Sequence, residues 1–167
     1  MSTPTQASAT PQESAHGGKF LTFFLAGEEY GLEILKVHEI IGMLPITRVP
    51  RTPEFVRGVI NLRGKVIPII DLRTKFGMDH DGALETSIIV VRVRGVQIGI
   101  VVDKVNEVLD IASSDIESTP SFGAEVDTRY LLGLGKTAGR VRLLLDIEHV
   151  LSASEIIDLQ AVRPDAA

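Results

Sequence analysis

Side chains that could carry out catalysis or bind a metal are few in this sequence, and they form no known catalytic pattern. There is no cysteine, which excludes thiol nucleophiles, disulfides and thiolate metal sites. The histidines are His16, His38, His80 and His149, and their spacing matches no metal motif such as His-Glu-x-x-His. No Ser/His/Asp arrangement can be singled out either. The sequence therefore predicts no catalytic residue, no metal and no cofactor, and a binding protein rather than an enzyme.

The segment most similar to a phosphate-binding loop is Gly-Leu-Gly-Lys at positions 133–136. The Walker pattern places its two glycines five positions apart and follows them with Lys and then Ser or Thr. Here a single residue separates the glycines, and the pattern that follows is typical of a strand and not of a helix. We therefore interpret this segment as a strand end or bulge.

The composition indicates a mainly β fold. Hydrophobic residues make up 44% of the 167 residues, but aromatic residues only 5%, and there is no Trp. The interior must therefore consist mainly of Val, Ile and Leu, of which the β-branched residues favour strands. The net charge of −5 argues against a nucleic-acid-binding protein. No apolar stretch approaches the roughly 20 residues that a membrane-spanning helix needs, so any link to a membrane is expected to run through a partner.

Three regions follow from the pattern along the chain. Residues 1–18 lack apolar periodicity and are expected to be a disordered leader, residues 19–160 form the folded part, and residues 161–167 form a flexible tail. Helices are expected at 115–118, with Ser114 as the cap, and after Ser152, which forms a capping box with Glu155. Residues 35–41 fit either a strand or one to two helical turns. Strands are expected at 19–25, 30–34, 56–62, 65–72, 88–93, 96–102, 105–111, 130–134 and 141–147.

The two halves of the folded part resemble each other. A shift of 68 positions places Gly31, Lys36 and Glu39 on Gly99, Lys104 and Glu107. Later in the chain a shift of 75 positions matches further glycines and carboxylates: Gly58, Gly64 and Asp71 fall on Gly133, Gly139 and Asp146. This pattern predicts two copies of a small barrel of about five strands. Such a unit is marginal alone, so the copies should share a core. The two equivalent aspartates are expected to bind turn amides.

Three segments carry specific motifs. Residues 28–40 read Glu-Glu-Tyr-Gly-Leu-Glu-Ile-Leu-Lys-Val-His-Glu-Ile, residues 58–73 contain Asn-Leu-Arg-Gly and then Ile-Pro-Ile-Ile-Asp-Leu, and residues 96–105 contain Gly-Ile-Val-Val-Asp-Lys. Their order and spacing resemble those of the CheW family of chemotaxis adaptors. Residues 130–135 and 145–148 resemble the C-terminal strands of that family, so the resemblance covers nearly all of the folded part.

The resemblance implies two intertwined five-stranded SH3-like β-barrels that share a core, with short helices that include one near the C-terminus. It implies a cytoplasmic adaptor with two partners and no catalytic activity. The partners are the cytoplasmic tip of a chemoreceptor (a methyl-accepting chemotaxis protein) and the regulatory domain of the histidine kinase CheA, within a receptor array. Direct membrane insertion and nucleic-acid binding are not implied.

The family's receptor-binding groove maps onto Val37, Glu39, Gly58, Asn61 and Arg63. The resemblance implies that Val37 provides an apolar contact, that Gly58 lets a receptor helix approach closely, and that Glu39 and Arg63 pair. Two alternatives remain at this point. The pair could serve only the stability of the first barrel, or Arg63 could be a solvated turn residue.

The kinase-binding residues are assigned to Met43, Leu44 and Phe122, because exposed apolar residues in loops are candidate anchors. These side chains could instead lie under their own loops. Three other identities remain to be distinguished. The first is the adaptor CheV, which would need an additional phosphoacceptor domain for which this sequence has no room, and the second is a detached regulatory domain of CheA. The third is a small β-barrel enzyme or ligand-binding protein, which a pocket with convergent polar groups would support.

Overall fold

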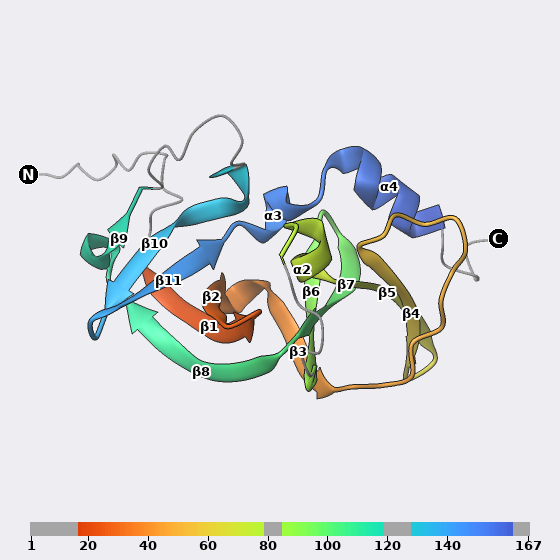
Figure 1. Cartoon of the computed structure of the whole chain (residues 1–167), viewed down its shortest axis with the longest axis horizontal. Helices are drawn as coiled ribbons and strands as arrows, with labels where there is room; N and C mark the ends of the chain where they lie inside the picture. Colours follow the sequence, from red (N-terminus) through yellow and green to blue (C-terminus); the bar gives the residue numbers. More distant parts are fainter. Residues whose placement is uncertain (1–16, 79–84, 119–127, 162–167) are drawn as a thin grey trace, which may run out of the picture.

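The computed structural model describes residues 17–78, 85–118 and 128–161. Two strand-rich bodies lie side by side, with α2, α3 and α4 along one side of the pair (Figure 1). The strands are β1 (Gly18–Leu25), β2 (Glu28–Glu33), β3 (Val37–Gly42), β4 (Val56–Leu62), β5 (Lys65–Ile70), β6 (Ser87–Val93), β7 (Val96–Val102), β8 (Lys104–Ile111), β9 (Ile116–Glu117), β10 (Leu131–Thr137) and β11 (Arg140–Leu145). The helices are the 3-10 turns η2 (Ile34–Lys36), η3 (Ser113–Asp115) and η4 (Thr128–Tyr130), and the α-helices α2 (Leu72–Lys75), α3 (Ile147–Val150) and α4 (Ala153–Ala161). None of the helices in these ranges is long and apolar enough to span a membrane.

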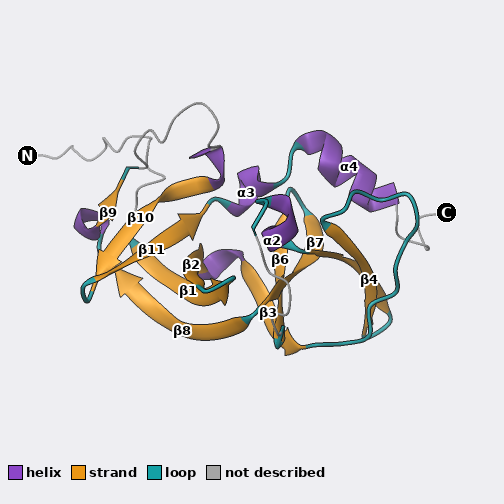
Figure 2. Ribbon diagram, in the orientation of Figure 1, coloured by secondary structure: helices purple, strands orange, loops and turns teal. Residues whose placement is uncertain are grey.

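The strands form two sheets, each of which curls into a barrel (Figure 2). The sheet of barrel A has the order β8-β1-β2-β11-β10-β9, and the sheet of barrel B has the order β3-β6-β7-β5-β4. The predicted mainly β fold of two barrels is thereby confirmed. Barrel B has the five expected strands, whereas the short strand β9 gives barrel A a sixth.

Each half of the chain contributes a hairpin to the barrel formed mostly by the other half. The β1–β2 hairpin pairs with β8 and β11 in barrel A, and the β6–β7 hairpin pairs with β3 and β5 in barrel B. Neither barrel can therefore be completed by one half of the sequence alone. The predicted intertwining is confirmed, and it has this exchange of hairpins as its structural basis.

The predicted duplication also matches the structure closely. The bounds of β4, β5 and α2, shifted by 75 positions, are those of β10, β11 and α3. The two parallel pairings are equivalent as well, because Gly31 pairs with Leu144 in barrel A and Gly99 pairs with Ile69 in barrel B. The side chains of Asp71 and Asp146 accept hydrogen bonds from backbone amides at the starts of α2 and α3, as expected from their equivalence.

The largest apolar cluster lies between the barrels and takes side chains from both sheets. Its members include Leu21, Phe23, Leu25, Tyr30, Leu32, Ile70, Leu72, Ile89, Val91, Ile98, Ile100, Val102, Leu145, Ile147 and Leu159. Each barrel adds a smaller cluster of its own, with six buried residues in barrel B and four in barrel A. Because the apolar residues of the exchanged hairpins are buried in the common cluster, separating the barrels would expose much of the interior to water.

The expectations for the helices have mixed outcomes. The helix predicted at 115–118 is wrong, because the chain makes only the turn η3 there and Glu117 then pairs with Leu134 of β10. A strand partner thus satisfies backbone groups that a helix would have paired internally. The C-terminal helix is confirmed with its capping box: Ser152 Oγ accepts from the Glu155 amide at 3.1 Å, and Glu155 Oε1 accepts from the Ser152 amide at 2.8 Å.

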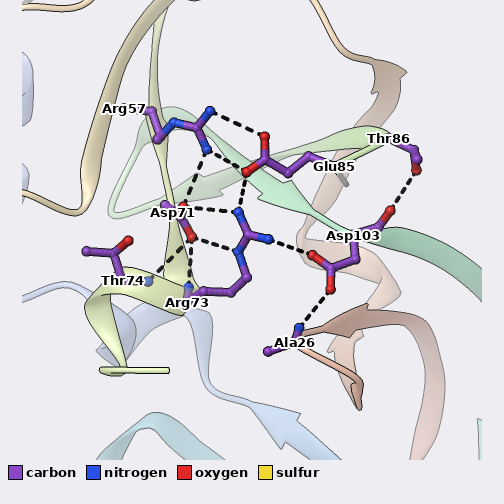
Figure 3. A network of polar contacts seen from close by, with 8 residues as sticks. All are labelled: Ala26, Arg57, Asp71, Arg73, Thr74, Glu85, Thr86 and Asp103. Atoms are coloured by element: carbon purple, nitrogen blue, oxygen red, sulfur yellow. Dashed lines mark hydrogen bonds and ion pairs between the residues drawn. The ribbon is translucent and has the colours of Figure 1, made fainter. Parts of the chain in front are cut away.

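A buried ionic cluster forms where the chain passes from barrel B to barrel A (Figure 3). Arg73, whose side chain is 1% exposed, donates to Asp71, to Glu85 and to Asp103, the last at 2.8 Å. Asp103 lies between β7 and β8, and its second oxygen accepts from the amide of Ala26 in the β1–β2 turn at 2.8 Å. The single guanidinium of Arg73 therefore links three parts of the fold: α2, the segment just before β6, and the connection between β7 and β8, where the chain passes from one barrel to the other.

The charges in this cluster favour the ionised carboxylates. Burial alone raises the pKa of Asp71 and of Glu85, because it removes their charged forms from water. The hydrogen bonds and charge of Arg73, joined at Glu85 by those of Arg57, outweigh this effect and hold both pKa values below the usual range. The contribution of these groups to stability is therefore full above their usual pKa of about 4 and is lost as the pH falls below it.

We predict that Glu85→Gln lowers the free energy of unfolding at pH 7 by about 2 to 4 kcal/mol, because it leaves Arg73 and Arg57 with one carboxylate fewer. The loss of stability as the pH falls from about 5 to about 3 should become smaller than in the unmodified chain, since glutamine does not titrate. Urea unfolding followed by circular dichroism measures both effects. The control is Asp110→Asn in the exposed Lys19–Asp110 pair, which should change stability by less than about 1 kcal/mol. An unchanged pH dependence in Glu85→Gln would contradict this role.

Candidate functional site

The five residues expected to bind a receptor lie on β3, on β4 and on the turn after β4, all in barrel B. β3 and β4 are the two end strands of its sheet. Arg63 Nη2 donates to Glu39 Oε1 at 2.5 Å and so connects the β4–β5 turn to β3. The predicted pair is present, and it bridges the seam where the two ends of the curled sheet approach each other.

The Asn-Leu-Arg-Gly motif is explained by the shape of the turn that carries Arg63. Asn61 Oδ1 accepts from the Gly64 amide at 2.7 Å, which closes the turn with a side-chain hydrogen bond. Arg63 itself has a φ of 53°, a left-handed conformation that residues other than Gly seldom adopt. Asn61 thus fixes the backbone from which Arg63 reaches Glu39, and its role in this structure is to position that residue.

The exposure of the pair separates the alternatives left open by the sequence. The Arg63 side chain is 67% exposed and that of Glu39 is 25% exposed. Arg63 is therefore neither a solvated residue without a partner nor a member of a buried pair. An ion pair with this much exposure contributes little to stability. The same exposure makes its charged groups accessible to a binding partner.

Gly58 is buried, and the chain that approaches it belongs to this protein. A Cβ atom at this position would lie 2.1 Å from the carbonyl oxygen of Thr47, and the φ of Gly58 is 141°. The close approach serves a backbone pairing, because the amide and carbonyl groups of Thr47 and Val59 exchange hydrogen bonds at 2.9 Å. Barrel A repeats this arrangement, since a Cβ at Gly133 would lie 2.7 Å from the carbonyl oxygen of Glu117. The close contact at Gly58 is thus part of barrel closure.

Exposed apolar residues beside the seam were not identified from the sequence. Leu35 in η2 is 94% exposed, and Ile40 on β3 is 44% exposed. Val37 and Glu39 face inward more than Ile40 does, because β3 alternates half-buried and exposed positions. A run of Val-His-Glu-Ile-Ile does not reveal which of its two isoleucines faces outward, and the charged residue at 39 suggests the opposite register, because Glu39 lies on the half-buried side of β3. We call η2, β3 and the β4–β5 turn, with the side chains of Leu35, Ile40, Glu39 and Arg63, the seam surface. Glu39 and Ile40 are consecutive on β3 and therefore point to opposite sides of the strand.

The equivalent surface of barrel A has different chemistry. Glu107 occupies the position equivalent to Glu39, but Ala138 stands where barrel B has Arg63. Barrel A has instead an ion pair of 2.5 Å between Lys136 of β10 and Glu117 of β9. The Glu39–Arg63 pair is therefore not a requirement of the barrel fold, and it distinguishes the seam surface from its counterpart.

The residues assigned to kinase binding have different environments. Met43 and Leu44 are half-buried and pack against the apolar cluster of barrel B, so they lie largely under their own loop. Phe122 lies outside the described residues. On barrel A, Val108 and Val141 are 48% and 57% exposed. The kinase assignment stays a prediction, and these two valines are further apolar candidates.

The Gly-Leu-Gly-Lys segment has the structural role expected of it. Gly133 and Gly135 lie inside β10, and the register of β10 against β11 shifts between Leu131 and Gly133. The segment is therefore a strand with a bulge and has neither the loop nor the following helix of a phosphate-binding motif.

We predict that Gly58→Ala strongly destabilises barrel B, because the new methyl group would overlap with the Thr47 carbonyl and the backbone conformation disfavours any side chain. The melting temperature should fall by roughly 10 °C or more, as expected for a loss of several kcal/mol. Gly42→Ala at the end of β3 is the control, because a Cβ there meets no atom within 4 Å. Equal melting temperatures of the two variants would refute this account of Gly58.

We also predict that a double-mutant cycle of Glu39→Ala and Arg63→Ala gives a coupling in stability below about 1 kcal/mol. The coupling should shrink further in 0.5 M salt, since the pair is exposed and screened. Chemical denaturation of the four proteins measures it. A coupling of several kcal/mol would mean that the pair acts as a buried structural link.

Comparisons with known proteins agree with this architecture. The model of the CheW-like domain family matches residues 19–155. The chain is 45% identical over 141 residues to a chemotaxis protein CheW of Klebsiella aerogenes, covering 84% of this chain and 85% of that protein. It is 34% identical over 153 residues to CheW of Bacillus subtilis, covering 90% and 96%. The crystal structure of the scaffolding protein TtCheW from Thermoanaerobacter tengcongensis superposes with a TM-score of 0.76 at 38% identity, covering 83% and 95%. The chain belongs to the CheW-like domain family.

Proposed function

We propose that this chain is a non-catalytic chemotaxis adaptor that couples a chemoreceptor to the histidine kinase CheA. The observation that carries the proposal is the family membership over nearly the whole described fold. The Glu39–Arg63 pair of the seam surface adds support, because the equivalent barrel A folds without such a pair. The named relatives are chemotaxis proteins, and the matching crystal structure is that of a scaffolding protein. An adaptor needs two binding surfaces on one rigid body, and the shared core provides such a body.

The seam surface is our proposed receptor-binding site. Leu35 in η2 and Ile40 on β3 offer exposed apolar area on the elements next to and carrying Glu39, and interfaces commonly combine apolar anchors with charged groups that fix orientation. Val37 lies half-buried at the start of the same strand and supports the backbone of this surface. In this proposal Asn61 and Gly58 act indirectly, the first by shaping the turn of Arg63 and the second by closing the barrel.

The kinase-binding surface is proposed to lie at the barrel ends. The regulatory domain of CheA is implied to have the same fold, so the two proteins would pair through similarly shaped surfaces. Met43, Leu44 and Phe122 remain our candidate contacts, with Val108 and Val141 added because they are exposed apolar residues of barrel A. We further propose that the chain acts in the cytoplasm and reaches the membrane only through the receptor array.

The test of the receptor surface uses the internal symmetry of the chain. Ile40 and Val108 occupy equivalent strand positions and have similar exposure, 44% and 48%. Ile40→Asp should weaken binding to a receptor fragment at least tenfold, because it removes an apolar anchor and introduces a charge. Val108→Asp on barrel A should change receptor affinity less than twofold. Isothermal titration calorimetry, with melting curves of both variants, measures these effects.

Function is tested by CheA autophosphorylation with receptor-containing membranes, in the presence and absence of this chain. The chain should increase receptor-dependent labelling of the kinase, and Ile40→Asp should abolish the increase. The chain itself should not become labelled by ATP. Labelling of the chain, or kinase control by the receptor that does not depend on the chain, would contradict the adaptor proposal.

A further inference from the structure

Each exchanged hairpin ends in a turn whose first backbone amide is bound by a carboxylate from outside the hairpin. In the β1–β2 turn, the Ala26 amide donates to Asp103 Oδ2 at 2.8 Å (Figure 3). In the β6–β7 turn, the Arg94 amide donates to Glu148 Oε1 at 3.3 Å. The shift of 68 positions that relates the two halves places Ala26 on Arg94, so these are equivalent contacts. We call the first the Asp103 clasp and the second the Glu148 clasp.

The same kinds of element complete both clasps, with the charges reversed. Arg73, the second residue of α2, binds Asp103 in the link between β7 and β8 at 2.8 Å. The shift of 75 positions places Arg73 on Glu148, the second residue of α3. Glu148 binds Lys36 in η2, which is the link between β2 and β3, at 3.2 Å. Each clasp therefore joins a helix, a link between the barrels and the turn of an exchanged hairpin.

The two clasps differ in burial and in the number of partners. The side chains of Arg73 and Asp103 are 1% and 18% exposed, and Arg73 binds two further carboxylates. Lys36 and Glu148 are both 35% exposed, and neither has a second ion pair within the described part of the chain. Separating a buried charge from several partners is costly, whereas an exposed pair contributes little to stability. The Glu148 clasp is therefore the weaker of the two.

The elements around the Glu148 clasp leave room for a shift. A cleft of about 360 Å³ lies there, lined by residues of η2, β3, β6, the β6–β7 turn and α3. None of the three residues of η2 is fully buried, and the cap of this 3-10 turn makes no side-chain hydrogen bond. A 3-10 turn also has poorer hydrogen-bond geometry than an α-helix. The Lys36–Glu148 pair is thus a principal contact that holds η2 in place.

We propose that the Glu148 clasp is a releasable contact that couples the seam surface to barrel A. Leu35 of the seam surface and Lys36 of the clasp are consecutive residues of η2. A receptor helix that packs on Leu35 shifts η2, separates Lys36 from Glu148 and frees the turn at Arg94. The Asp103 clasp stays closed and keeps the barrels joined. α3, which carries Glu148, directly follows β11 of barrel A, so the release reaches the second barrel.

The coupling to a receptor rests on the receptor-binding surface proposed above, whereas the inequality of the two clasps is a property of the chain alone. Coupling between two sites is reciprocal. A partner that opens the Glu148 clasp must therefore bind more tightly to a variant in which that clasp is already weakened. The two parts of the proposal can for this reason be tested separately.

The first experiment measures hydrogen exchange of the ¹⁵N-labelled full chain by NMR without any partner. After correction for intrinsic rates, the Arg94 amide should exchange about tenfold faster than the Ala26 amide, or more, because local opening is easier at the weaker clasp. Glu148→Ala should increase the Arg94 rate by a further factor of about three and change the Ala26 rate by less than about twofold. Equal protection of the two amides would overturn the inequality of the clasps.

Glu117→Ala is the matched control, because the Lys136–Glu117 pair is also exposed but lies outside both clasps. It should change both rates by less than about twofold. An effect on Arg94 as large as that of Glu148→Ala would show that loss of any surface ion pair loosens the turn, and would overturn the role of Glu148.

The second experiment adds a receptor fragment. Binding should increase the exchange rate of the Arg94 amide about threefold and leave Ala26 unchanged, and Glu148→Ala should lower the dissociation constant of the fragment about twofold to fivefold. Glu117→Ala should leave that constant unchanged. Binding that leaves Arg94 as protected as before, or an unaltered affinity of Glu148→Ala, would overturn the coupling. A fragment that does not bind at all would instead contradict the proposed receptor surface, while the exchange rates of the free chain still decide whether the clasps are unequal.

Discussion

The structure depends on the exchange of hairpins between the two halves of the chain, and Arg73 holds the crossover where this exchange occurs. This buried guanidinium contacts three carboxylates from α2, from the start of β6 and from the link between β7 and β8. Asp103 extends the network to the β1–β2 turn in the other barrel. A buried charge without these partners would be strongly destabilising, so the network specifies one relative placement of the two barrels. Both proposed binding surfaces inherit their spacing from that placement.

The two barrels have equivalent frames, and the differences between them show which features the common fold does not require. Inside barrel A, Glu29 is 4% exposed and lies 3.1 Å from Arg142, whereas the equivalent residues of barrel B are Gln97 and Ile67. At the surface, barrel B has an ion pair that barrel A lacks: the Glu39–Arg63 pair is present in barrel B, and Ala138 stands in place of the arginine in barrel A. Positions that differ between equivalent barrels are not required by the fold, and the seam surface is the clearest exposed case.

Much of the fold could be predicted from the sequence because the same pattern of strands and turns occurs in both halves of the chain. Matched glycines and aspartates identified equivalent turns, and the Ser152–Glu155 box identified the last helix. The exchange of hairpins could not be read from periodicity, because it depends on long-range pairing. Residues 115–118 were predicted as a helix because the local cap signal was read without the partner strand β10. The function of Gly58 was also hidden, since the backbone of Thr47 that approaches it lies eleven positions earlier in an irregular segment.

We propose above all that one rigid body binds a receptor and the kinase at the same time through different surfaces. Sedimentation velocity of the chain mixed with a receptor fragment and the CheA regulatory domain tests it directly. We expect a single boundary with the mass of all three components, and Ile40→Asp should release only the receptor fragment. Mutually exclusive binding, in which adding the kinase domain displaces the receptor fragment, would contradict the account.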